Sequence, residues 1–130
     1  MNVRKAIEYW TKSAEYDLEV ADSLFENEKY HYALFFGHLA IEKILKGIFV
    51  KKKQEHAPFS HSLTILSREA ELDIDGARLE KLAEFMEFYI EGRYPRDMES
   101  VFTKCSENYT REKLGEIKEM YQWLMEKLEG

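Results

Sequence analysis

The chain has 130 residues, with 25 acidic side chains against 19 basic ones and a formal net charge of −6. This length fits a single domain, residues 1–130, that buries its own core. The net negative charge opposes nonspecific attraction to a nucleic-acid backbone, so a nucleotide or RNA site has to be a local basic patch. The single cysteine, Cys105, excludes an internal disulfide framework, and with the four histidines it forms no zinc-binding spacing.

The two segments that a membrane or export pathway would use lack the necessary pattern. The opening residues, MNVRKAIEYWTKSAEYDLEV, have no uninterrupted apolar stretch of the kind that a secretory signal needs. The longest apolar run, YALFFGHLAI, is too short to cross a bilayer. We therefore expect a cytoplasmic protein with no membrane segment.

The first half of the chain has the helical period. Apolar residues recur every three or four positions from Ile7 to Phe25, which predicts a helix over about residues 3–26. After the polar link NEKY the same period runs to about Val50, and the short link predicts two antiparallel helices. Three lysines at 51–53 close the second helix at the negative end of its dipole, and Pro58 confirms the break.

The second half predicts shorter elements. Ser60 is the expected N-cap of a short third helix, and Asp73 or Asp75 starts a fourth that runs through Tyr89 to the stretch GRYPRD. Residues 97–108 lack a sustained period and are predicted to be a loop or a partly ordered crossing, and Thr110 is the expected N-cap of the last helix. The chain is thus predicted to be an all-α, up-and-down bundle of four long helices and one short helix.

The stretch GRYPRD, residues 92–97, carries the most specific chemistry. Gly92 accepts the left-handed conformation that ends a helix, and Pro95 prevents the helix from resuming. Arg93 and Arg96 have donor groups suited to phosphate or carboxylate, and a base can stack on the ring of Tyr94. The alternative is structural: the arginines neutralise the helix end or pair with neighbouring acids, while Tyr94 packs on the bundle.

A second polar group is predicted on the second helix. His38, Glu42 and Lys46 are four residues apart and share one face, which ordinary Glu42 to Lys46 pairing explains in part. His61 begins the third helix and turns its ring either to a backbone group or to a ligand. No complete metal motif, Gly-rich phosphate loop or nucleophile motif is present, so no metal and no cofactor are predicted.

Several segments together resemble the HEPN domain, a small helical family named for nucleotide binding in higher eukaryotes and prokaryotes. The matching residues, in the family's order, are Trp10, Ala14, Asp17, Leu18, Ala21, Ala33, Ala40-x-Glu42-Lys43-x-Leu45-Lys46, His61-x-Leu63 and Arg93-Tyr94-Pro95. The resemblance spans nearly the whole chain. It implies a bundle of four or five helices, usually a homodimer, and often the partner of a minimal nucleotidyltransferase in a toxin–antitoxin pair.

The resemblance also bears on catalysis. Some members of the family cleave RNA without a metal, using an arginine followed after four to six residues by a histidine. Here Met98, Glu99 and Ser100 stand at those places after Arg93, and Val101, Phe102 and Thr103 stand there after Arg96. The motif histidine is therefore missing, and whether the chain is an enzyme stays open.

Three functions follow as hypotheses. The leading one is a nucleotide- or RNA-binding module in which Arg93 and Arg96 hold phosphate and Tyr94 stacks, with His61 and Lys46 as further binding residues. The second is a metal-independent ribonuclease in which His61 or His38 replaces the missing histidine. The third is a pure interaction protein, in which the arginines and aromatic residues dock a partner chain.

Overall fold

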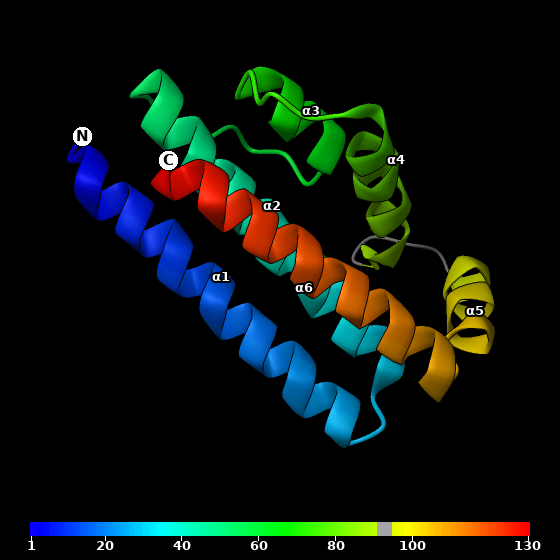
Figure 1. Ribbon diagram of the computed structural model, residues 1–130. Helices are drawn as coiled ribbons and strands as arrows, with labels where there is room; N and C mark the ends of the chain where they lie inside the picture. The colour runs from blue at the N-terminus through cyan, green and yellow to red at the C-terminus, as the bar shows by residue number, and fades with distance from the viewer. Residues whose placement is uncertain (91–94) are drawn as a thin grey trace.

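The protein is built around three long helices, α1 (Val3–Glu26), α2 (Tyr30–Lys53) and α6 (Glu107–Glu129). This computed structural model describes residues 1–90 and 95–130, except for the side chains of residues 95–98 and 101. The three helices lie side by side, and both ends of the chain are at the same end of the bundle (Figure 1). The all-α fold predicted from the helical periods is confirmed, and the described residues contain no strand.

The first two helices begin and end close to where the sequence predicts. The side chain of Asn2 caps α1 by accepting a hydrogen bond of 3.0 Å from the Lys5 backbone N–H. Helix α2 ends at Lys53, and its C-cap residue Gln54 has a left-handed conformation with φ of 59°. The lysines at the end of α2 do more than face solvent, because Lys51 donates to the Leu128 carbonyl and Lys52 donates to the Glu71 carbonyl at 2.8 Å.

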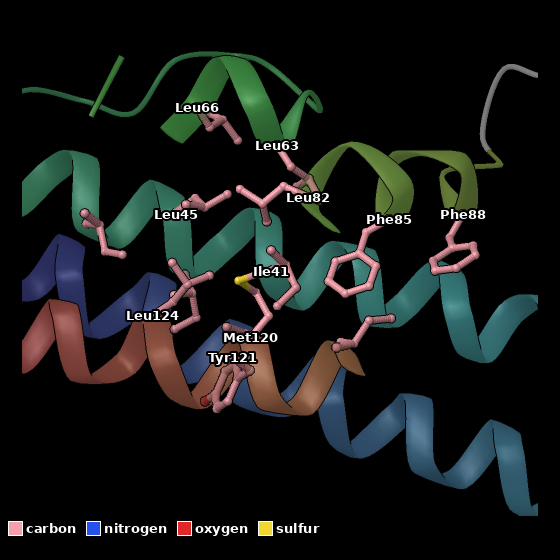
Figure 2. Packing of buried hydrophobic residues seen from close by; sticks show 14 of the residues in the cluster. Ile41, Leu45, Leu63, Leu66, Leu82, Phe85, Phe88, Met120, Tyr121 and Leu124 are labelled. Atoms are coloured by element: carbon pink, nitrogen blue, oxygen red, sulfur yellow. The ribbon is translucent and has the colours of Figure 1, made fainter. Parts of the chain in front are cut away.

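Helix α2 is the centre of the core. Fourteen of its 24 residues are buried, because α1 and α6 pack on one side of it and shorter helices pack on the other. Figure 2 shows Ile41 and Leu45 of α2 between these two groups, with Leu63 above and Leu124 below. A helix that is covered on both sides has apolar residues around most of its circumference, which is what this segment of the sequence contains.

On the second side of α2, helix α3 (Leu63–Glu69) packs on α2, while α4 (Gly76–Phe85) packs on α3 and adds Leu82 and Phe85 to the core. Ser62, not Ser60, caps α3 by accepting from the Ile65 N–H at 3.2 Å. Asp75 caps α4, as one of the two alternatives predicted. Helix α4 ends at Phe85 and is followed by one 3-10 turn, η1 (Met86–Phe88), so the predicted continuation to GRYPRD is wrong by about one helical turn.

The predicted loop before the last helix is also wrong. Residues Pro95–Lys104 form helix α5, so the described residues contain six α-helices, one more than expected. Proline does not end a helix here but opens one, because a first-turn residue needs no N–H donor. Phe102 of α5 packs on the His31 ring with 3.9 Å between centroids, and a ten-residue helix depends on such contacts. Ser106, not Thr110, caps α6.

Specific polar contacts fix the helices against one another. Lys43 of α2 lies 2.7 Å from the Asp17 carboxylate of α1, which is almost completely buried. Lys81 of α4 lies 3.0 Å from Glu116 of α6, and hydrogen bonding to Glu84 raises the pKa of Lys113. In the described part of the chain, no helix has both the length and the apolar character needed to cross a membrane.

Candidate functional site

A group of polar and aromatic side chains meets where α2, the loop before α3 and the end of η1 come together. We call it the Glu42 cluster, and its members are His38, Glu42, Lys46, His61 and Tyr89. Three of them lie on one face of α2 because their positions differ by four residues. The other two are brought there by the packing of α3 and η1 on α2.

Glu42 is the centre of this cluster, and its side chain is 5% exposed. Its carboxylate oxygens lie 3.0 and 3.2 Å from His61 Nδ1, and Oε2 lies 3.1 Å from Lys46 Nζ. Because a carboxylate accepts hydrogen bonds, the Nδ1 atom of His61 carries the hydrogen. The buried glutamate thus connects the two predicted residues His61 and Lys46, which are fifteen positions apart in the sequence.

His61 is the exposed member of the cluster. Its side chain is 57% exposed, and its ring stacks on the Tyr89 ring with 4.5 Å between centroids and 22° between planes. Among the residues whose side chains are described, its Nε2 atom has no hydrogen-bond partner. The carboxylate fixes one nitrogen and the tyrosine ring fixes the plane of the imidazole, so the orientation of the second nitrogen is also fixed.

His38 has the opposite character. Its ring is fully buried, and among the described residues neither ring nitrogen has a hydrogen bond. Burial lowers the pKa of His38 from 6.5 to about 4. A polar contact with the His61 backbone, too weak in geometry to count as a hydrogen bond, acts against this change, and the His61 ring adds to it electrostatically. A ring that solvent does not reach has no contact with a substrate, so His61 is the better of the two predicted replacements for the motif histidine.

Lys46 is nearly as buried as Glu42. Its side chain is 9% exposed, and its ammonium lies 3.1 Å from Glu42 and 5.3 Å from the centre of the Trp10 ring. An ammonium group in such surroundings loses hydration, and these two contacts offset part of that loss. The predicted pairing of Glu42 with Lys46 is therefore present, but in the interior and not on a solvated face.

The predicted arginine corner is only partly within the described residues. Arg93 and Tyr94 lie outside them, and Arg96 falls in the first turn of α5, where its side chain is not described. The prediction that these three residues form a binding surface therefore remains a prediction. Of the five predicted residues, the structure brings His61 and Lys46 together.

Tyr89 is the member of the cluster that the sequence analysis placed in the fourth helix and did not select as a site residue. It follows directly after η1, where the helical period ends, so the helical period does not determine the direction of its ring. It contacts His61 and also His38, whose ring centroid is 5.2 Å away. The sequence feature that could have indicated a site role for Tyr89 is its position at a predicted helix end, four residues before Arg93. In the described parts of the chain, no group of three potential ligands is placed to hold a metal ion.

Comparisons with known proteins agree with this architecture. The sequence profile of the HEPN domain matches residues 7–128, almost the entire chain. A crystal structure of TT1696 from Thermus thermophilus is similar with a TM-score of 0.77 and 20% identity, covering 93% of this chain and 97% of that one. ST0689, an archaeal HEPN homologue, is similar with a TM-score of 0.73 and 20% identity, covering 94% and 97%.

No curated protein sequence matches this chain. At 20% identity the two solved structures establish the fold alone. The family assignment comes from the profile, whose match covers far more than half of the sequence. The chain therefore belongs to the HEPN domain family.

Proposed function

We propose that this HEPN domain binds a nucleotide or an RNA segment at a surface formed by His61, Lys46, Arg93, Tyr94 and Arg96. It does so as a homodimer and as the partner of a minimal nucleotidyltransferase in a toxin–antitoxin-like pair. The arginines hold phosphate, the exposed imidazole donates to or accepts from the ligand, and Tyr94 stacks on a base.

The observation that carries this proposal is the arrangement of His61. The imidazole of His61 is exposed, stacks on Tyr89 and is oriented by the buried Glu42. Keeping it there requires a carboxylate that is removed from water and a loop that is ordered, and both are unfavourable in free energy. If these side chains served stability alone, an exposed histidine among them would not be required. Groups that are held in place before the ligand arrives bind it with less loss of entropy, so the arrangement favours a binding role.

Charge supports the same surface. The chain carries a net charge of −6, so binding of a polyanion depends on a local excess of positive groups. The short stretch GRYPRD contributes two arginines against one acidic residue, and it follows the Glu42 cluster directly in the sequence. Single-stranded RNA is bound by this combination of cations and aromatic rings.

Anisotropy of a labelled short single-stranded RNA, with ATP and GTP as competitors, tests the proposal. The double variant Arg93→Ala, Arg96→Ala is expected to lose binding, with thermal unfolding nearly unchanged. If residual binding is measurable, the slope of log K against log salt should fall in magnitude by about 1.4, for two phosphate contacts. The control removes two exposed arginines elsewhere, Arg4→Ala with Arg68→Ala. Equal loss in both double variants would reduce the effect to net charge and contradict the proposal.

A second candidate function, metal-independent RNA cleavage, is favoured by the hydrogen bond between His61 and Glu42. A carboxylate that holds Nδ1–H leaves Nε2 as a proton acceptor, the arrangement of a general base. Cleavage of the same RNA in the presence of a chelator should then disappear in His61→Ala and weaken in Glu42→Gln. RNA that binds but stays intact, with wild-type protein in excess, would exclude this function and leave the binding module.

The partnership has its own test. Coexpression with a minimal nucleotidyltransferase encoded beside this chain should give a complex that survives purification at moderate salt. Sedimentation of the isolated chain should give the mass of a dimer. Failure to co-purify, with RNA binding retained, would remove the partner from the proposal and keep the binding function.

A further inference from the structure

A cavity of about 380 Å³ lies on the Trp10 side of Lys46. Trp10, Val50 and Ala57 give it apolar walls, His56 and Lys46 give it polar groups, and Phe59 stands at its edge. Its volume is within the range of roughly 300–1,000 Å³ that is typical of small-molecule sites. Because Lys46 also binds Glu42, the cavity is connected to the Glu42 cluster through one side chain.

Lys46 has donor capacity that the protein does not use. An ammonium group has three N–H donors, and among the described residues Lys46 Nζ makes one hydrogen bond, to Glu42 Oε2 at 3.1 Å. Its side chain is 9% exposed, so little solvent reaches the other donors. An acceptor on a molecule in the cavity would give these donors a partner inside the protein.

Phe59 is held away from the core. Its side chain is fully exposed, at 106% of the reference area. The Ser60 N–H donates to the Pro58 carbonyl at 3.0 Å, which closes a tight turn with Phe59 at its centre. A single exposed apolar residue is ordinary, but here the turn sets the backbone of a residue that lines the cavity, and its exposed ring offers a face on which a planar ligand can stack.

We propose that this cavity binds a nucleobase that presents a carbonyl oxygen to Lys46 and stacks on Phe59. This inference rests on the proposed function and adds to it which base the protein prefers. Lysine has no acceptor, so the atom facing it has to be an acceptor. Guanine and uracil have a carbonyl at the edge where adenine and cytosine have an amino group, so the N7 acceptor of adenine stands beside a donor that would face the ammonium. The site therefore prefers guanine and uracil over adenine.

The test uses the fluorescence of Trp10. Trp123→Phe leaves Trp10 as the only tryptophan, since the chain has two. Titration with GMP or UMP should change its emission saturably, and AMP should bind at least tenfold more weakly. Phe59→Ala should weaken GMP binding about tenfold, as loss of a stacking ring does. Tyr16→Ala removes another exposed ring, 67% exposed and outside the cavity, and should have no effect.

Lys46→Met tests the acceptor preference, because it should bring GMP and AMP to equal affinity. That variant leaves Glu42 without an ammonium partner, so its folding is checked by circular dichroism. If it does not fold, the GMP and AMP comparison in the wild-type background and the Phe59→Ala result decide the proposal. No response of Trp10 to any nucleotide, equal GMP and AMP affinity, or equal effects of Phe59→Ala and Tyr16→Ala would overturn it.

The two proposals fail separately. RNA binding that depends on Arg93 and Arg96, with no Trp10 response to nucleotides, would overturn the base site and leave the proposed function. A GMP preference that depends on Phe59, with no RNA binding and no effect of the two arginine substitutions, would support the cavity and contradict the arginine surface.

Discussion

His38 should make the stability of this protein depend on pH. Its pKa falls from 6.5 to about 4 on folding because its ring is buried. Between these two values the unfolded chain binds a proton that the folded protein does not bind. A protein whose unfolded state binds more protons loses stability as the pH falls. The contribution is therefore fully present above about pH 6.5 and is lost progressively between about pH 6.5 and pH 4.

The size of the effect follows from these two pKa values. Lowering the pH from 7 to 5 should reduce the free energy of unfolding by about 2 kcal/mol, and by about 3 kcal/mol once the pH is below 4. This is a large part of the roughly 5–15 kcal/mol that stabilises a typical domain. The range from pH 7 to 5 is the informative one, because at lower pH many carboxylates also titrate.

The assay is urea unfolding followed by far-ultraviolet circular dichroism at pH 7, 6, 5.5 and 5, on the wild type and on His38→Leu. Leucine fills the core with an apolar group that does not titrate, so the variant should show a smaller loss by about 2 kcal/mol over this range. Burial and Lys29 also lower the pKa of His31, which likewise makes the protein less stable as the pH falls. Because His31 is present in both proteins, its effect cancels in the comparison. His56→Asn, at an exposed position, is the control.

One result would refute this reasoning. His38 Nδ1 lies 3.9 Å from Glu42 Oε1, so a protonated ring would be attracted to a buried carboxylate. If the wild type and His38→Leu lose equal stability between pH 7 and 5, this attraction offsets the cost of burying the charge. The folded pKa of His38 would then be close to its ordinary value.

Two further predictions concern the helices. Gly115 lies in the interior of α6 with no atom within 4 Å of an added Cβ, so Gly115→Ala should raise the free energy of unfolding, measured by urea, by about 0.5–1 kcal/mol. Gly37→Ala should raise it less, because Ile117 Cδ1 would lie 2.8 Å from the new carbon. Lys43→Met should lower the free energy of unfolding by about 3 kcal/mol, because it leaves Asp17 buried without its cation. Adding Asp17→Asn should recover part of this loss. No recovery would show that packing, and not charge, is responsible.

The residues of the candidate site could be selected from the sequence only in part. His38, Glu42 and Lys46 share a helix face because of a local spacing, and that spacing was visible. Whether the face was solvated or buried was not visible, because it depends on the helices that cover α2. His61 stood out as a polar residue near a helix start, but its link to Glu42 spans 19 positions, which no local pattern encodes.

The sequence by itself determined the all-α class and the bounds of α1 and α2, because a helical period sustained over more than twenty residues is a strong local signal. It failed at α5 and at the end of α4, where ten-residue segments take their conformation from their neighbours as much as from their own pattern. Only the tertiary structure decided that one buried carboxylate on α2 orients an exposed histidine from the next loop, because packing alone brings distant segments within hydrogen-bond distance.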